Sequence, residues 1–234
     1  MDMNARIKLF ISLFLLFSYH GLFALEITKE AEAYIKGEYN RGNYNNGEVQ
    51  LLGNIGLNEL VNFKLGFSYL QNTASPEFNV LFKTGFSPFN NQYLSPLSFS
   101  VSYLLNTIVE YDVTTHSIFP SVSYKTERFG AEIGVSLRLT SFFGESPQFE
   151  SILSFYIYCN FIKTNALTIG AGCGTFDDFN ARNMGALWLD LNVDVRISKN
   201  LTIMNEFVWL QSGLDGFSAV FYGISYKGGV KFSW

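Results

Sequence analysis

The chain has 234 residues, of which 15% are charged and 17% are aromatic, whereas about 25% of residues are charged in typical soluble domains. Mean hydropathy is +0.14, yet beyond the N-terminus no apolar stretch reaches the roughly 18 residues that a membrane helix needs. The sequence therefore excludes a helical membrane protein and argues against disorder and a coiled coil. The formal net charge of −4 also argues against a nucleic-acid-binding protein.

Residues 1–24 have the pattern of a secretory signal peptide. Arg6 and Lys8 precede an apolar run from Leu9 to Phe17, and Ala24 is a small residue at a suitable cleavage site. The alternative, a membrane anchor, is disfavoured because the run is too short to span a bilayer. Cleavage after Ala24 leaves residues 25–234 with a net charge of −5.

Beyond residue 25 the apolar residues recur at every second position, which indicates β-strands. Leu97, Phe99, Val101 and Tyr103, for example, are separated by serines. Each such run has one apolar and one polar face, as a strand between two solvents requires. Twelve runs follow this pattern, at about residues 27–39, 48–57, 60–71, 78–87, 97–106, 115–126, 129–141, 149–162, 166–176, 186–197, 201–211 and 217–234.

The connections between these runs alternate between tight turns and longer loops, such as the turn at Glu127-Arg128 and the loop at residues 142–148. Outer-membrane barrels have this alternation, with short turns in the periplasm and longer loops outside. We therefore predict an all-β protein, a closed antiparallel transmembrane β-barrel of about 12 strands, with 10 strands as the nearest alternative. An even strand number places both termini in the periplasm.

Aromatic residues of the apolar register gather near both ends of the strands, as they do at the two interfaces of a membrane. The opposite register is rich in Ser, Gly, Asn and Tyr, which suit a crowded lumen. Both features favour a membrane barrel over a soluble barrel or sandwich whose apolar face points inward. The aromatic residues are Phe63, Phe86, Tyr124, Phe129, Phe161 and Phe232 at the turn end, and Tyr39, Tyr69, Phe78, Tyr103, Phe149 and Trp209 at the loop end.

The last segment alternates from Tyr222 to the terminal Trp234 and includes Phe232. It resembles the C-terminal strand of bacterial outer-membrane β-barrel proteins, which the assembly machinery of that membrane reads. This resemblance implies the cell outer membrane of a diderm bacterium, with membrane lipid and the barrel-assembly machinery as partners and Phe232 and Trp234 as the assembly signal. In strand number the chain is similar to small monomeric channels such as the nucleoside and acidic-sugar porins, but no residue-level match implies a substrate.

The polar register carries eight acidic and eight basic residues, so the net negative charge lies in turns and loops, mostly at the loop end. Such an acidic mouth raises the local concentration of cations. Alternatively, it is a solvated surface that binds divalent ions between lipid head groups. Its acidic residues are Glu48, Glu77, Glu110, Asp112, Glu145, Asp177, Asp178 and Asp215, against Arg41 and Arg182.

One patch of the lumen is predicted to be acidic. Strand pairing about Lys199 places Glu206 opposite Asn192. Glu206 then lies diagonal to Asp190 and Asp194 at mid-height. These carboxylates either form a constriction that favours cations or are neutralised by a base across the lumen, for which the candidates are Arg138 and Lys36.

Five aromatic side chains point into the lumen by register, namely Tyr34, Tyr156, Tyr158, Trp188 and Phe221. They either narrow the lumen and stack on a flat solute, or they plug it. A barrel of this size has a backbone diameter of about 25 Å, which leaves about 10 Å at most for ions, sugars or nucleosides.

Two further pairings follow from the predicted hairpins. Cys159 is expected opposite Ile169, which leaves Cys173 too far along the sheet for a disulfide. Closure of the first strand onto the last brings lumen charges of opposite sign together, Glu30 and Glu32 with Lys227 and Lys231.

Enzymatic interpretations are weak. The mature chain has one histidine, His116, and its neighbour Ser117 faces the other side of the strand. Asp177 and Asp178 lack nearby residues to complete a metal site. We expect no catalytic residues, metal or cofactor, and no nucleic-acid partner. The sequence favours a narrow, weakly cation-preferring channel for passive diffusion of small hydrophilic solutes; the alternative is a non-conducting structural or surface-binding barrel with an occluded lumen.

Overall fold

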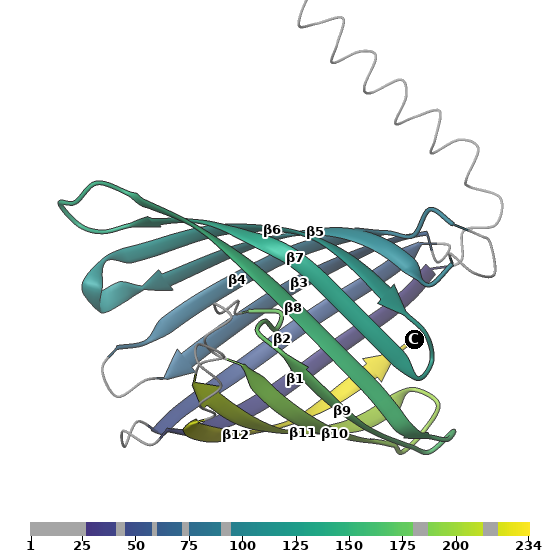
Figure 1. Ribbon diagram of the computed structural model, residues 1–234. Helices are drawn as coiled ribbons and strands as arrows, with labels where there is room; N and C mark the ends of the chain where they lie inside the picture. Colours follow the sequence, from purple (N-terminus) through teal and green to yellow (C-terminus); the bar gives the residue numbers. More distant parts are fainter. Residues whose placement is uncertain are drawn as a thin grey trace, which may run out of the picture.

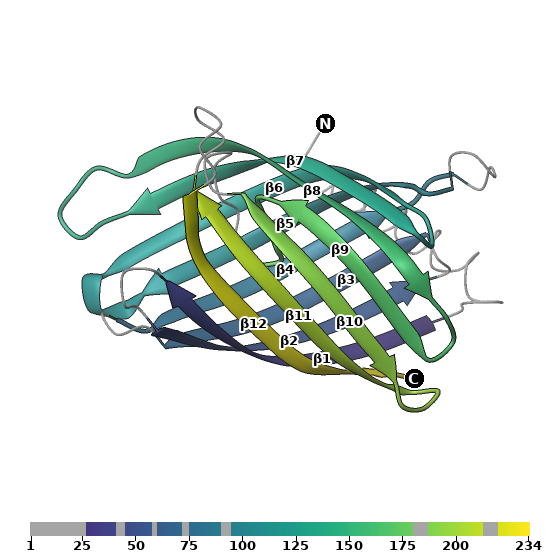
Figure 2. The ribbon, with the colours of Figure 1, turned by 60° about the horizontal axis from the view of Figure 1, so that its bottom comes forward.

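The computed structural model describes residues 27–40, 45–57, 60–71, 75–89, 95–179, 187–212 and 220–234. They form a closed antiparallel barrel of twelve strands in which each strand pairs with its neighbours in sequence and β12 closes on β1 (Figure 1, Figure 2). The strands are β1 (Ile27–Asn40), β2 (Asn45–Leu57), β3 (Val61–Gln71), β4 (Glu77–Phe86), β5 (Leu97–Ile108), β6 (Val113–Lys125), β7 (Phe129–Ser141), β8 (Gln148–Lys163), β9 (Leu167–Gly174), β10 (Trp188–Arg196), β11 (Leu201–Ser212) and β12 (Val220–Ser233).

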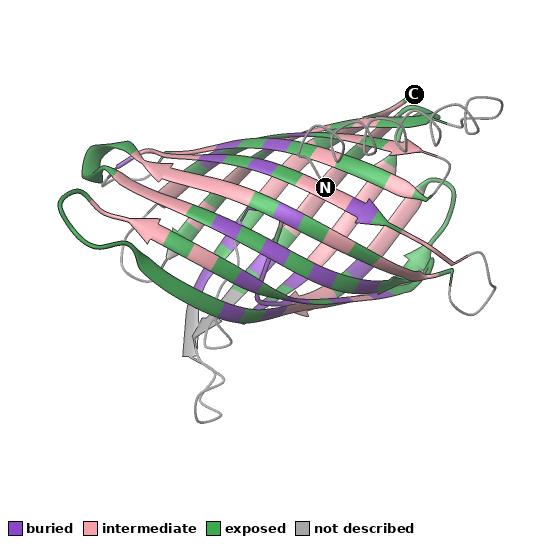
Figure 3. Cartoon of the chain, turned by 90° about the horizontal axis from the view of Figure 1, so that it is seen from above, coloured by how far each residue is buried: buried purple, intermediate pink, exposed green. Residues whose placement is uncertain are grey.

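The twelve-strand barrel confirms the predicted fold, and its polarity is inverted relative to a soluble protein. The outer face is apolar, since Ile35, Leu65 and Phe149 are 71%, 62% and 69% exposed. The inner face is polar, and Ser68 and Ser154 on it are fully buried. Exposed and buried residues therefore alternate along β6 and β7, and stretches of the same alternation are visible in the barrel wall (Figure 3). The alternative of a soluble barrel with its apolar register inward is wrong.

Helical structure in the described part of the chain is limited to one 3₁₀ turn, Val109–Tyr111, between β5 and β6. No helix among these residues is long and apolar enough to cross a membrane. The predicted signal peptide, residues 1–24, lies outside the described residues, as do Arg41, Arg182 and Asp215 of the predicted mouth.

The seam between β1 and β12 is held by charge as well as by backbone pairing. Lys231 Nζ lies 2.9 Å from Glu30 Oε2 and 3.5 Å from Glu32 Oε1. These distances confirm the predicted approach of Lys231 to the two glutamates. Lys227, the fourth residue predicted at this seam, pairs instead with Glu206 of β11, at 3.6 Å. The closure therefore brings opposite charges together on the lumen side.

The pairing of β8 with β9 differs from the prediction by two residues. Cys159 lies opposite Ala171 instead of Ile169. The Thr164 hydroxyl accepts hydrogen bonds from two following backbone N–H groups, which places the turn further along the chain than expected. A β-bulge just before the turn offsets part of this shift. Cys159 and Cys173 are both free.

Candidate functional site

The lumen contains a polar cavity of about 430 Å³ in the half of the barrel that carries the tight turns. Its walls include inward side chains near those turns, such as Asn62 and Lys125. Two hydroxyl groups of the wall bind each other, since Ser98 and Ser123 form a hydrogen bond of 2.7 Å between β5 and β6. The cavity has the volume of a small-molecule site. Residues 176–179 border it on the loop side.

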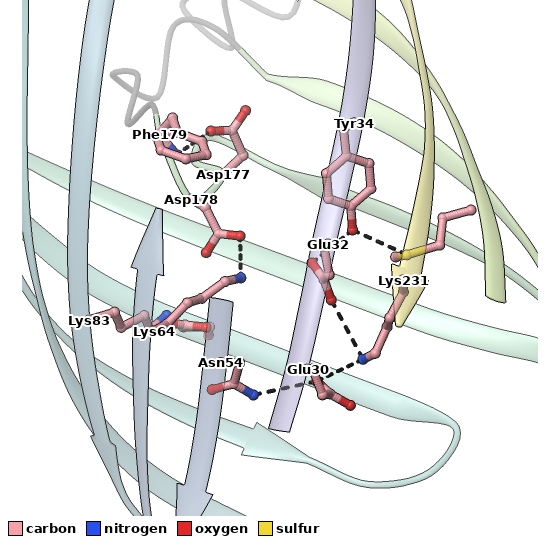
Figure 4. A network of polar contacts seen from close by, with 12 residues as sticks. Glu30, Glu32, Tyr34, Asn54, Lys64, Lys83, Asp177, Asp178, Phe179 and Lys231 are labelled. Carbon is pink, nitrogen blue, oxygen red and sulfur yellow. Dashed lines mark hydrogen bonds and ion pairs between the residues drawn. The ribbon is translucent and has the colours of Figure 1, made fainter. Parts of the chain in front are cut away.

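Residues 175–179, which follow β9, fold into the lumen, and we name them the inner segment (Figure 4). Thr175 is fully buried and continues the sheet, since its N–H donates to the carbonyl of Phe155 at 2.8 Å and its hydroxyl accepts from the N–H of Phe155 at 3.1 Å. The Asp177 carboxylate then accepts a hydrogen bond from the N–H of Phe179 at 2.8 Å. This contact closes a tight turn that directs the chain inward.

Two phenylalanines hold the inner segment against the lumen wall. Phe176 belongs to a buried cluster with Phe119, Trp188 and Val208, and Phe179 belongs to a second with Tyr34, Leu52 and Leu81. Gly66 of β3 makes room for the second ring, because a Cβ there would lie only 2.8 Å from Phe179 Cζ. The wall is therefore complementary in shape to the inner segment.

Asp178 holds the inner segment by charge. Its carboxylate accepts a hydrogen bond from Lys64 Nζ at 2.6 Å, an ion pair between the β9–β10 connection and β3 (Figure 4). Lys64 lies directly opposite Lys83 in the pairing of β3 with β4, and Lys83 pairs with Glu132 of β7 at 2.9 Å. Burial raises the pKa of the Asp178 carboxyl, but the Lys64 and Lys83 ammonium groups outweigh burial and hold this pKa below its usual range.

The predicted acidic mouth loses three of its members, Glu48, Asp177 and Asp178, to the lumen. Asp178 lies inside the barrel, and Glu48 is buried at an inward strand position, where it pairs with Lys36 at 3.7 Å. Glu110 and Glu145 are exposed in the loop-end connections, as predicted. The mouth is therefore less negative than the sequence suggests.

The inner segment narrows the lumen strongly. Two voids adjoin it, of about 40 and 30 Å³, each close to the volume of one water molecule. Of the inner segment, Phe176, Asp177 and Asp178 line the larger void, and Asp177 lines the smaller one. In this arrangement neither void admits a sugar.

The predicted acidic patch has the predicted register, since Asn192 lies opposite Glu206 in the pairing of β10 with β11. Asp190 is buried, at 3% exposure, and accepts hydrogen bonds from the Tyr156 hydroxyl at 3.1 Å and the Asn192 amide at 2.6 Å. Asp194 lies on the same inner face of β10, four residues further along the strand. The donors to Asp190 are neutral, whereas Glu206 is paired with a lysine.

The two bases expected to neutralise this patch pair elsewhere. Arg138 lies 3.9 Å from Glu150, and Lys36 lies 3.7 Å from Glu48. Lys227 of β12 pairs with one member of the patch, Glu206 of the neighbouring β11, at 3.6 Å. Among the described residues, the ion pair of a patch carboxylate is therefore with Lys227, and neutralisation by Arg138 or Lys36 stays a prediction.

Four of the five predicted lumen aromatics lie on the inner face, and the side chain of the fifth, Phe221, lies outside the described part. Tyr34 and Trp188 are 7% and 6% exposed and belong to the clusters that hold the inner segment. Tyr156 packs against Phe176, with ring centroids 6.5 Å apart, and the Tyr158 ring lies 6.0 Å from that of Tyr156. Tyr34 and Trp188 therefore fill the lumen rather than present free faces to a solute.

His116 and Ser117 face opposite sides of β6, as predicted. His116 Nδ1 lies 2.8 Å from the hydroxyl of Tyr103 on the outer face, whereas Ser117 is buried on the inner face. Within the ranges that the structure describes, no group of three or more His, Cys, Asp or Glu side chains is placed to hold a metal ion.

Solved structures similar to this chain include porins and an outer-membrane channel. The NanC porin matches with a TM-score of 0.59 and 13% identity over 86% of this chain and 98% of the porin. The chain has the fold of the outer-membrane β-barrels. The KdgM porin matches with a TM-score of 0.54 and 10% identity over 87% of this chain and 99% of the porin. An outer-membrane channel from Pseudomonas putida matches with a TM-score of 0.53 and 8% identity over 91% of this chain and 97% of the channel.

At these low sequence identities, the similar structures show the barrel fold of this chain but assign it to no subfamily. No protein-family model matches the sequence, and no curated protein matches it.

The inner segment is the functional feature that the sequence analysis missed. The alternation pattern assigns Asp177 and Asp178 to an outer loop, because loops of a barrel lie outside it by default. Two features are consistent with an inward position of the inner segment. Phe179 is an apolar residue in the connection that follows the predicted run 166–176, and two lysines face each other on β3 and β4.

Proposed function

We propose that this barrel is a narrow outer-membrane channel for the passive diffusion of small hydrophilic solutes. The observation that carries this proposal is the polar cavity of about 430 Å³ inside the closed barrel. Hydroxyl, amide and charged side chains line it, and these groups offer hydrogen bonds to water and to polar solutes.

The similar structures support this proposal. NanC and KdgM are porins, and one KdgM structure is a complex with disordered oligogalacturonate, matched at a TM-score of 0.53 and 13% identity. In this chain Lys64, Lys83 and Lys227 of the cavity wall are each paired with a carboxylate. We therefore propose small, polar molecules of about the size of a sugar as solutes.

A weak preference for cations is a further part of the proposal. Asp190 receives its hydrogen bonds from neutral groups, so its charge is not cancelled by its donors. Asp194 adds a second carboxylate on the same strand face, and exposed Glu110 and Glu145 add negative potential at the loop end.

The proposed location is the outer membrane of a diderm bacterium, with residues 1–24 as the signal peptide and both termini in the periplasm. Phe232 and Trp234 support an assembly signal, because both are exposed on the outer face with ring centroids 5.4 Å apart. Trp234 also exchanges backbone hydrogen bonds of 3.0 and 3.3 Å with Lys29. We propose that the barrel-assembly machinery reads this strand and that lipid contacts the apolar outer face.

The second candidate function is a non-conducting structural or surface-binding barrel. The observation that favours it is the inner segment, because Phe176 and Phe179 fill the lumen together with residues of the wall. In both cases we propose a protein without enzymatic activity.

Liposome swelling distinguishes the two candidates. Liposomes that contain the folded protein should swell in isotonic monosaccharide and swell progressively less with larger sugars, while protein-free liposomes exclude all of them. If the protein is folded by circular dichroism and the liposomes admit no sugar of any size, the channel proposal fails and the occluded barrel stands.

A further inference from the structure

Lys64 and Lys83 form an unusual pair on the lumen wall. They lie directly opposite each other on β3 and β4 and both line the turn-end cavity. Like charges in this position repel each other and destabilise a sheet. Each lysine therefore needs a counter-charge. Lys83 receives it from Glu132 of β7, at 2.9 Å.

The counter-charge of Lys64 comes from outside the sheet. Its ion-pair partner among the described residues is Asp178 of the inner segment, at 2.6 Å. The side chains of Lys64 and Asp178 are 22% and 32% exposed, and both border the turn-end cavity. A solute in that cavity can therefore reach the lysine and compete with the carboxylate of Asp178.

We propose that Lys64 and Lys83 form a binding site for a small oxyanion, a carboxylate or phosphate group carried by a solute, and that Asp178 occupies this site as a tethered substitute. An anion that binds there displaces Asp178. The inner segment then loses its ionic contact with the wall and keeps the packing of its two phenylalanines and the hydrogen bonds of Thr175 to Phe155. Anion binding and release of the inner segment are therefore coupled.

Trp188 reports release of the inner segment without any measurement of transport. It is 6% exposed and packs in the cluster that contains Phe176. The chain has three tryptophans, and the other two, Trp209 and Trp234, are 40% and 58% exposed on the outer face. A variant with Trp209→Phe and Trp234→Phe leaves Trp188 as the single fluorophore.

The test is acrylamide quenching of Trp188 in this variant, folded in detergent, during titration with inorganic phosphate, acetate or chloride at constant ionic strength. We expect quenching to rise with phosphate and with acetate but not with chloride. A response to phosphate alone restricts the site to phosphate groups, and a response to acetate alone restricts it to carboxylates. Asp178→Asn should show high quenching without added anion.

Lys83→Gln is the discriminating variant, because it keeps the Lys64–Asp178 pair and removes half of the proposed site. Its titration midpoint should rise roughly tenfold or more, the effect of losing one charged hydrogen-bond partner. Lys231→Gln is the matched control, since this lumen lysine pairs with Glu30 and Glu32 at the seam, and its midpoint should not change. Equal effects of chloride and the oxyanions, equal midpoints in the two variants, or no response at all would overturn the proposal.

Discussion

Replacement of Asp178 by asparagine should shift the barrel toward an open lumen. The substitution keeps the size of the side chain and removes the charge that pairs with Lys64 at 2.6 Å. The inner segment then retains the packing of Phe176 and Phe179 in their two clusters. The variant therefore isolates the ionic contribution to the closed arrangement.

The expected change in the ratio of closed to open states follows from the type of contact that Asp178→Asn removes. A hydrogen bond between charged groups contributes about 1.5–3 kcal/mol, which corresponds to a change of roughly 10- to 150-fold in the ratio of closed to open states. Burial of each phenylalanine side chain contributes about 1.5–3 kcal/mol to the closed state. Asp178→Asn should therefore open the lumen more often but not permanently.

Single-channel recording in planar bilayers measures this ratio directly as closed and open dwell times. Glu206→Gln is the matched control, because it removes one lumen carboxylate, the partner of Lys227 at 3.6 Å, and leaves both residues of the Lys64–Asp178 pair in place. The charge exchange of Lys64→Asp with Asp178→Lys should restore dwell times near those of the wild type. Identical dwell times in wild type and Asp178→Asn, or an equal change in Glu206→Gln, would refute the reasoning.

Three further outcomes are expected. Under a KCl gradient the reversal potential should indicate cation preference, and it should move toward zero in the Asp190→Asn/Asp194→Asn variant; anion preference in the wild type contradicts the proposal. Lys231→Gln should lower the stability of the barrel by about 1–3 kcal/mol, because two carboxylates at the seam lose their partner, and an unchanged urea midpoint in detergent argues against this role. Cys159 and Cys173 should remain reduced in the purified protein, and a disulfide found by mass spectrometry would contradict the β8–β9 register.

The strands and their faces could be predicted from the sequence because alternation depends only on the two solvents that a strand separates. The register of β10 with β11 was also accessible, since a tight turn fixes the pairing of Asn192 with Glu206. The register of β8 with β9 was not, because the turn after β8 lies further along the chain than its residues indicate, and the bulge before it offsets only part of that shift.

Contacts across the lumen were less predictable than pairings within the sheet. Periodicity assigns Arg138 and Lys36 to the inner face but does not say which carboxylate each one reaches. The inner segment is the clearest case, because its position depends on a pocket above Gly66 and on the unbalanced charge of Lys64 opposite Lys83. Both are properties of the assembled barrel wall rather than of the loop sequence.

The central claim is that the lumen conducts and that the inner segment is its narrowest part. The unitary ion conductance of the wild type and of the Phe176→Ala/Phe179→Ala variant in planar bilayers tests it most directly, because this variant removes both apolar contacts of the inner segment. The account predicts a small conductance in the wild type and a clearly larger one in the variant. Equal conductances would contradict the role of the inner segment, and the absence of conductance in both folded proteins would contradict the channel itself.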